Sequence, residues 1–292
     1  MNYDYILMTD SDSDLPYTIA EEKNIPVVSM PYTLDGVPYM DDNGRSGNEK
    51  KLLDRMRKGS VPTTSLLPAE AYMEAFEPIL REKDLLFIAF SSAMSNTILN
   101  VYEARDRLLK KYPDRKFMVV DTLSISGTMT LLVLGAHALY EAGSPMEEVA
   151  EWVMDHRMKS QVWMTVGDLK YLARGGRLSP TSAIFGTALN IRPIICIGKS
   201  GKMEAVERVR GKNKALKTIV EHTVRDIDHP QDQTLILMHG DVPEEAEKLA
   251  GMIRDAIPTL KDIRIQMVGP VIGAHCGPGT LACIFMGKGR QQ

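Results

Sequence analysis

The chain has 292 residues, of which 44% are hydrophobic and 25% charged, and its formal net charge is −3. This length and composition are typical of a globular protein of about two domains, and the charge argues against nucleic acid as a partner because no basic field would attract a polyanion. Residues 1–10 lack the basic and apolar regions of a signal peptide, and the three cysteines form no Cys-x-x-Cys pair. We therefore expect a cytoplasmic protein.

The first half of the chain alternates short apolar runs with amphipathic segments. Strands are expected at residues 5–8, 25–34, 85–90 and 116–120, and helices at 48–58, 69–82, after 95 to about 110, from about 124, and at 145–158. Ser46 or Asn48 is expected to cap the 48–58 helix, and 61–68 to be a loop. The stretch 122–140 has no charged side chain but many hydroxyls, which predicts a buried helix and no membrane insertion. The alternation indicates βαβ units and a doubly wound parallel sheet.

A change of domain is expected near Lys159. The predicted domains are an N-terminal α/β domain at 1–159, carrying head-group loops for a ligand, and a C-terminal mixed α/β domain at 160–292. In the second domain we expect strands at 161–165, 193–197, 202–209, 234–239, 263–268 and 281–286, and helices at 211–225 and 243–257. The glycines at 198 and 201 predict a hairpin between the second and third of these strands.

Two glycine-punctuated segments, 171–179 and 271–280, carry side chains suited to an anion. Arg177 offers a planar fork of donors for a carboxylate or phosphate. His275 lies between Gly273 and Gly277, so we expect it in a turn and not in a regular element. Together the two segments predict one anion site at the end of a sheet.

Hydroxyl groups follow several of the predicted strands. In an open α/β sheet, ligands bind beyond the carboxyl ends of the strands, and hydroxyls with helix N-terminal amides bind anions there. The candidate pairs are Thr64 with Ser65 and Ser91 with Ser92. The alternative, that these residues cap helices, stays open for both pairs.

Metal and nucleotide signatures are weak or missing in the sequence. Asp10, Asp12, Asp14 and Glu21 have the spacing of an EF-hand loop, but Leu15 occupies the position that requires glycine. The six histidines form no His-x-x-x-His pair, and no P-loop, G-x-G-x-x-G or G-x-S-x-G motif occurs. We expect no metal and no cofactor. The 18 methionines, against 6 phenylalanines, favour an adaptable apolar pocket, although an ordinary core would also use them.

Seven segments, in order along nearly the whole chain, resemble the DegV family, which includes the fatty-acid-binding subunits of bacterial fatty acid kinase. They are Thr9-Asp-Ser-Asp-Ser-Asp-Leu-Pro16, Pro62-Thr-Thr-Ser65, Ser91-Ser-Ala-Met-Ser95, Val119-Val-Asp-Thr122 with Ser126-Gly127, residues 172–179, Val209-Arg-Gly-Lys-Asn-Lys-Ala215 and Gly273-Ala-His-Cys-Gly-Pro-Gly-Thr280. The chain departs from the family pattern at 66–68, where the family usually has Gln-Pro-Ser, and at Asn96, where it usually has Gly.

The resemblance implies two α/β domains that enclose an acyl chain, in a protein without catalysis of its own. The acyl-chain pocket is expected in the domain at 160–292. Thr64, beside Ser65, and a serine of the pair Ser91 and Ser92 would hold the fatty acid carboxylate. Arg177 and His275 would lie nearby, in contact directly or through water. Arg210 would face a separate ATP-using fatty acid kinase, which forms an acyl phosphate from the presented lipid.

Two other functions remain possible from the residues alone. One is a small-molecule transferase with Arg177 as anion clamp and His275 as acid/base. The other is a regulatory module that only senses a lipid. The basic run from Arg208 to Lys214 is compatible with a solvated face, an acidic partner or a phosphate.

Overall fold

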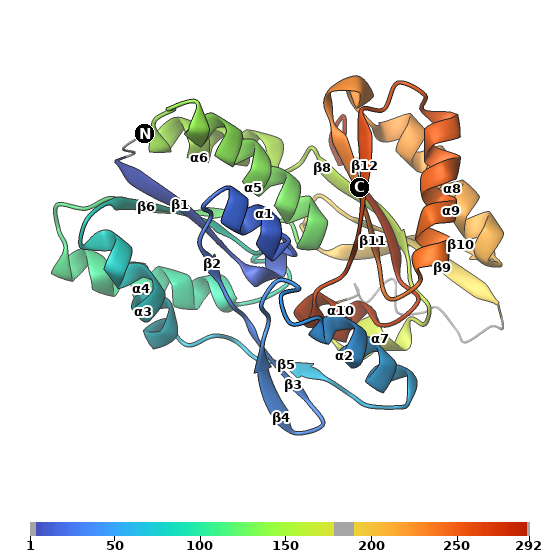
Figure 1. Ribbon diagram of the computed structural model, residues 1–292, viewed down its shortest axis with the longest axis horizontal. Coiled ribbons are helices and arrows are strands. Elements are labelled where there is room, and N and C mark those ends of the chain that lie inside the picture. Colours follow the sequence, from blue (N-terminus) through green and yellow to red (C-terminus); the bar gives the residue numbers. More distant parts are fainter. Residues whose placement is uncertain (1–3, 178–189, 291–292) are drawn as a thin grey trace.

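The computed structural model describes residues 4–177 and 190–290. A four-stranded parallel sheet forms the core of the first half of the chain (Figure 1). Its strand order is β2-β1-β6-β7. The strands are β1 (Tyr5–Asp10), β2 (Val27–Val28), β6 (Asp84–Ala89) and β7 (Phe117–Asp121), and the helices around them are α1 (Tyr17–Glu22), α3 (Ala69–Leu80), α4 (Thr97–Lys111), α5 (Ser126–Glu141) and α6 (Met146–His156).

Helices cover both faces of this sheet, as the doubly wound prediction requires. Along β6, Leu85 and Phe87 pack in the cluster that contains α3 and α4, whereas Leu86 and Ile88 pack with α5 and α6. The alternation follows from the strand, whose successive side chains point to opposite faces. Both faces of β6 are apolar, so the strand is buried on each side.

A small antiparallel sheet extends from the first half, with strand order β4-β3-β5. Its strands are β3 (Pro31–Leu34), β4 (Val37–Met40) and β5 (Thr63–Thr64), and helix α2 (Asn48–Arg57) lies between β4 and β5 in the chain. Two expectations were wrong here. The predicted loop 61–68 contains β5, because Thr64 pairs with Tyr32. Helix α2 begins after Gly47 without a side-chain cap, since Gly47 takes a positive φ of 66° that serine or asparagine would adopt less readily.

The second half forms a mixed six-stranded sheet in the order β10-β9-β8-β13-β11-β12. Strands β11 and β12 are parallel, and the other neighbours are antiparallel. The predicted hairpin is confirmed as β9 and β10. The elements are β8 (Ser160–Thr165), β9 (Ile191–Ile197), β10 (Met203–Arg210), β11 (Thr234–His239), β12 (Asp262–Met267), β13 (Leu281–Met286), α8 (Lys212–Asp226) and α9 (Pro243–Ala256).

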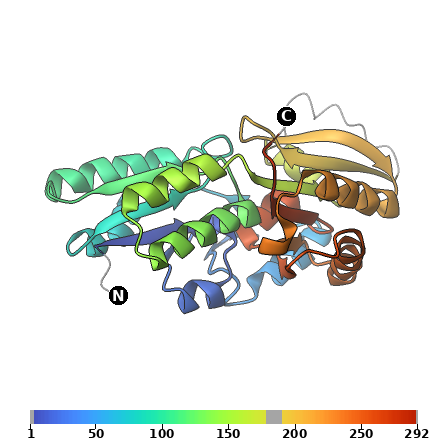
Figure 2. The ribbon, with the colours of Figure 1, turned by 90° about the horizontal axis from the view of Figure 1, so that it is seen from above.

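The two large sheets lie in separate lobes, side by side along the long axis of the molecule (Figure 2). Helices α8 and α9 cover one face of the six-stranded sheet, and the other face is turned toward α5. We keep residue 159 as the proposed boundary between the domains. None of the helices in the described ranges is both long and apolar enough to cross a membrane.

Two short helices replace the turns expected at the glycine-punctuated segments. They are α7 (Lys170–Arg174) and α10 (Pro270–Cys276), so the expectation that His275 lies in a turn was wrong. Pro270 stands at the first turn of α10, and Gly277, with φ 74°, ends it. Proline at the start and glycine just past the end are helix signals that the sequence already contained. Leu178 and Ser179, the end of the first segment, lie outside the described residues.

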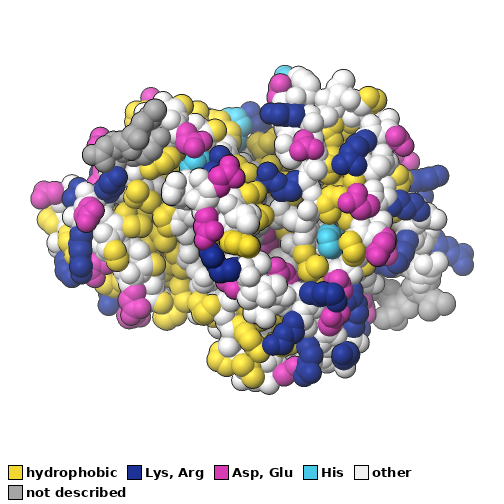
Figure 3. Space-filling view, viewed as in Figure 1, with side chains coloured by type: hydrophobic (Ala, Val, Ile, Leu, Met, Phe, Trp, Pro, Cys, Tyr) yellow, Lys and Arg dark blue, Asp and Glu magenta, His cyan; other side chains and the backbone are white. Residues whose placement is uncertain are grey.

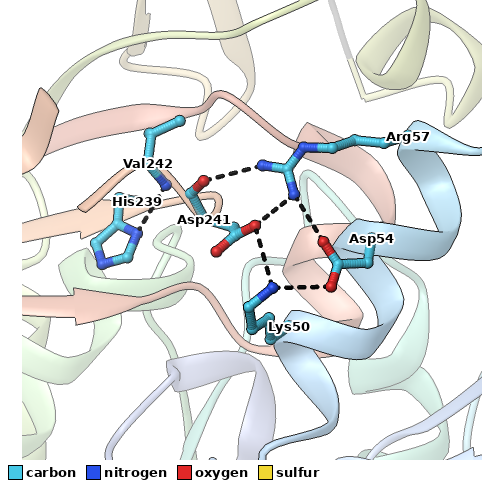
Figure 4. A network of polar contacts seen from close by, with 6 residues as sticks. All are labelled: Lys50, Asp54, Arg57, His239, Asp241 and Val242. Atoms are coloured by element: carbon cyan, nitrogen blue, oxygen red, sulfur yellow. Dashed lines mark hydrogen bonds and ion pairs between the residues drawn. The ribbon is translucent and has the colours of Figure 1, made fainter. Parts of the chain in front are cut away.

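A polar network joins α2 to the loop after β11 (Figure 4). The guanidinium of Arg57 donates to the carboxylate of Asp241 and, at 2.9 Å, to its backbone oxygen. Lys50 lies 3.9 Å from the same carboxylate and donates to Asp54 at 2.8 Å. The network therefore ties the small-sheet region to the second lobe.

We expect Asp241→Asn to weaken this connection only slightly. The side chains of Lys50 and Arg57 are 61% and 38% exposed, and ion pairs in contact with water contribute little to stability. The melting temperature should therefore fall by roughly 2 °C. Thermal unfolding at low and at high salt measures the effect. The difference from the wild-type protein should shrink as salt screens the pair; an equal difference at both salt concentrations would contradict the electrostatic origin.

Candidate functional site

A cavity lies between the inner face of the six-stranded sheet and loops of the first lobe. It contains about 1160 Å³ of space not filled by protein atoms, its open mouth included. Most of the lining is apolar, and residues from both sides of position 159 contribute to it. The cavity is therefore built from both halves of the chain, whereas the family resemblance placed the ligand pocket within 160–292.

The floor of the cavity is the inner face of the sheet. Met238, Ala282 and Met164 are direct cross-strand neighbours on β11, β13 and β8, and all three line the cavity. Two residues farther along, Ile284 and Val162 form a second row. The intervening side chains point to the opposite face because the side-chain period of a strand is two. Five of the lining residues are methionines: Met30, Met94, Met164, Met203 and Met238.

The start of α5 forms the opposite wall. Ile125, Ser126 and Thr128 line the cavity there. A Cβ atom on Gly127 would lie 2.6 Å from Ile284 Cδ1 and 3.0 Å from Met238 Sδ. The missing side chain thus allows α5 to approach the sheet closely enough to enclose the space.

Hydroxyl, imidazole and guanidinium groups meet in this cavity. Thr64 on β5 and His275 on α10 are hydrogen bonded, with 2.9 Å between Oγ1 and Nε2. Ser65 and Arg177 line the same cavity, and Arg177 donates to the backbone oxygen of Gly175. Burial, with a smaller contribution from Arg177, lowers the pKa of His275 to about 4. At neutral pH the imidazole is therefore uncharged, and Arg177 supplies the positive charge.

The structure brings Thr64, Ser65, Arg177 and His275 together, as the sequence suggested. It places the other two predicted residues elsewhere. Ser91 is buried and its hydroxyl accepts from the Ala93 amide at 3.2 Å. Ser92 is exposed and donates to Asp121 at 2.6 Å. Neither is among the residues that line the cavity.

Ser95 lines the cavity in their place. It belongs to the same serine-rich loop, and its hydroxyl accepts from the amide of Thr97, the first residue of α4, at 3.2 Å. The signal was its position just before a helix, where a hydroxyl commonly satisfies free amides. Ser91 and Ser92 were predicted from their position after β6 and from the family resemblance, whereas in the structure their hydroxyls bond to the Ala93 amide and to Asp121, respectively.

Arg210, the predicted partner-facing residue, is exposed at the end of β10. Lys and Arg side chains gather on this side of the molecule, over α8 and β10 (Figure 3). Lys212 next to it forms an ion pair with Glu245. Hydrophobic side chains gather instead at the β3–β4 hairpin, where Val37 and Met40 are half exposed (Figure 3). Within residues 4–177 and 190–290, no three His, Cys, Asp or Glu side chains are grouped to hold a metal ion.

These features define a class of protein: a two-lobed α/β protein with a mainly apolar cavity that also contains anion-binding groups. The DegV family model, described as an uncharacterised protein of the DegV family, matches residues 5–288, and the chain belongs to this family. DegV domain-containing proteins of Clostridium perfringens and Streptococcus pyogenes are 34% and 33% identical to it. These alignments cover 98% and 97% of this chain and 99% and 98% of the relatives.

Solved structures of the family have the same fold. A DegV lipid-binding protein of Thermotoga maritima is 25% identical with a TM-score of 0.84, covering 99% of this chain and 100% of that one. A DegV family protein of Thermus thermophilus, described by its fatty acid binding, is 27% identical with a TM-score of 0.85, covering 96% and 98%. The predicted family and α/β fold are confirmed.

Proposed function

We propose that this protein binds a long-chain fatty acid in the cavity and presents its carboxylate to a separate kinase. The observation that carries the proposal is one cavity with a methionine-rich apolar floor and with Thr64, Ser65, Arg177 and His275 in its lining. The fatty acid binding described for the Thermus thermophilus relative supports it.

The energetics suit an acyl chain. Each methylene moved from water into an apolar cavity contributes about 0.8 kcal/mol, so the chain itself supplies most of the affinity. A buried carboxylate without partners would be costly. In our proposal Thr64, Ser65 and Ser95 donate hydroxyl hydrogen bonds to it, and Arg177 neutralises its charge. Ser91 and Ser92 have an indirect role, since their hydrogen bonds hold the loop that carries Ser95.

The partner in this proposal is an ATP-using fatty acid kinase, and the protein itself is not an enzyme. Arg210 supports the assignment of the docking surface, because it is exposed within a basic run that continues to Lys214. A pull-down with the wild-type protein should recover the kinase, and Arg210→Ala should recover less of it. Equal recovery by both proteins would remove Arg210 from the docking surface.

One observation favours a transferase as the second candidate. The Thr64–His275 hydrogen bond has the geometry of a hydroxyl held against a base. A transferase would turn over a soluble substrate, and His275→Ala would lower its rate without lowering its affinity. In the described residues no hydrogen bond joins His275 to a carboxylate that would orient the ring, which makes lipid binding the better account of the pair.

Mass spectrometry of organic extracts tests the main proposal. Protein purified under native conditions should release a long-chain fatty acid, and delipidated protein should take up added oleic acid. An extract without any acyl chain, together with no uptake, would refute lipid binding.

Arg177→Ala should weaken fatty acid retention. A charge-assisted hydrogen bond contributes about 1.5–3 kcal/mol, so we expect roughly tenfold weaker binding or more. Fluorescent fatty acid displacement measures it. Lys51→Ala is the control, because Lys51 is an exposed cation of α2 that does not line the cavity. Equal affinities of the two variants would contradict the role of Arg177.

A further inference from the structure

Asp12 is an unexpected residue for the lining of an apolar cavity. It lies in the short 3-10 turn η1 (Ser11–Ser13) that follows β1, and only 4% of its surface is exposed. Its Oδ1 atom is buried and has no hydrogen-bond partner among the described residues. Buried polar atoms in native proteins are nearly always paired, so an unpaired one next to a cavity indicates a ligand that completes it.

The surroundings of Asp12 disfavour its ionised form. Three other buried carboxyl groups, those of Asp10, Asp14 and Asp41, lie close enough to interact with it. In the described part of the chain none of the four forms a salt bridge, and Arg177 is the cation that acts on Asp12. Burial lowers the pKa of His275 and raises that of Tyr72 well above its ordinary value, so neither is charged at neutral pH. Glu49 and Asp42 add negative charge that acts on Asp14 and Asp41, which further disfavours ionisation of the group.

Asp12 also differs from its acidic neighbours in its hydrogen bonds. Asp14 accepts from the Gly269 amide and the Ser126 hydroxyl, and Asp41 accepts from the Asn43 amide through Oδ1. The Oδ2 atom of Asp41 also has no partner among the described residues, but Asp41 does not line the cavity. Asp10 accepts from the Asp12 amide at 3.1 Å. Among residues 4–177 and 190–290, no donor bonds to a carboxyl oxygen of Asp12, and its Oδ1 is fully buried. Burial, followed by repulsion from Asp10, raises the pKa of Asp12 well above its ordinary value.

We propose that Asp12 is held as a neutral carboxylic acid and donates its O–H to the carboxylate of the bound fatty acid. This inference rests on the proposed function. Where Asp12 is already protonated in the empty protein, no covalent bond changes and the proton stays on Asp12. Where Asp12 is ionised in the empty protein, binding takes up one proton from solvent, which forms the O–H bond of Asp12. A carboxyl group kept neutral by an apolar site is known to act as a hydrogen-bond donor to an anion.

The proposal makes lipid binding proton-linked. An ionised Asp12 would repel the lipid carboxylate, so affinity should fall as the pH rises through the pKa of Asp12. An amide in its place keeps a hydrogen-bond donor at every pH. Asp12→Asn should therefore bind the lipid without this pH dependence, whereas Asp12→Ala lacks the donor and should bind more weakly.

The experiment measures the affinity for oleic acid at about pH 6 and at about pH 9, both above the ordinary pKa of a carboxyl group. The wild-type affinity should fall at least about tenfold over this range, which is 1.4 kcal/mol, and that of Asp12→Asn less than about threefold. Asp255→Asn, an exposed acid-to-amide change on α9, is the matched control and should behave as the wild type. Titration of oleic acid itself is common to all the proteins and cancels in the comparison.

Parallel pH profiles of the wild type and Asp12→Asn would overturn the inference while leaving lipid binding intact. Absence of oleic acid binding by the wild type at both pH values would instead refute the proposed function. A second experiment uses the wild-type protein alone, so its result does not depend on whether the variants fold. Calorimetry at about pH 9 in two buffers of different ionisation enthalpy should show proton uptake on binding; no uptake there would also overturn the inference.

Discussion

Replacing Ala282 by phenylalanine should greatly weaken the proposed fatty acid binding while leaving the protein folded. Ala282 is in the middle of the cavity floor, between Met238 and Met164. A phenyl ring there would extend toward the start of α5 and fill space that the acyl chain needs. Displacing three or four buried methylenes removes about 3 kcal/mol of transfer free energy, so affinity should fall by roughly 100-fold.

Fluorescent fatty acid binding and thermal unfolding together check this result. Because the ring would enter a cavity and not a filled core, the melting temperature should change little. Val224→Phe is the matched control, since Val224 is 45% exposed on α8 and its replacement leaves the cavity unchanged. If Ala282→Phe bound fatty acid as tightly as the control, the acyl chain would have to lie somewhere else.

The second large effect concerns stability, which should decrease as the pH rises from about 5 to about 8. Burial raises the pKa of Asp10 and of Asp41 from 3.8 to about 7. Between these values the folded protein binds more protons than the unfolded chain, so the free energy of unfolding falls with increasing pH. Asp12 and Asp14 are shifted in the same direction, also mainly by burial.

His275 has the opposite effect on stability, and it acts over a lower range of pH. Its pKa is lowered from 6.5 to about 4, so the unfolded chain binds the extra proton and stability rises with pH between these values. Burial lowers the pKa of His239 as well, so two imidazoles oppose four carboxyl groups, and the effect of the imidazoles fades as the pH rises past 6.5. The net change from about pH 6.5 to about pH 8 should therefore be a clear loss of stability, of several degrees in melting temperature.

Asp41→Asn tests the origin of this loss. The amide cannot ionise, so the variant should be more stable than the wild type at about pH 8 and its melting temperature should depend less on pH. Asp255→Asn, on the exposed side of α9, should leave the profile unchanged. A wild-type melting temperature that rises between pH 6.5 and 8, or an unchanged slope in Asp41→Asn, would contradict the explanation.

Long elements with strong periodicity could be predicted, and short ones could not. Strands such as β6 are continuous apolar runs, and the alternation with helices predicted the parallel sheet. The strand β5 has two residues and exists because Thr64 pairs with Tyr32, which is distant in sequence. Helix α10 was missed because glycines at 273 and 277 suggested a turn, whereas Gly273 packs within the helix against Leu52.

Some residues of the candidate site could likewise be predicted from the sequence, and others could not. Arg177, His275 and Thr64 could be proposed because each lies in a short segment with a chemical signature. Ser95 and Asp12 could not be chosen over their neighbours, because the path of a loop depends on contacts such as Ser92 with Asp121. A pattern of alternating aspartates looks the same whether the loop is solvated or buried.

The order of residues by itself determined the family, the α/β class and the set of polar groups available to a ligand, since periodicity and motif order are properties of the chain. Only the folded protein decided that Met238, Ala282 and Met164 form one row and that Gly127 lets α5 close the space above them. It also decided that Asp12 lines this space with a buried Oδ1 atom that has no partner among the described residues. The reason is that cavities and burial arise between segments far apart in the chain, where close packing sets the distances.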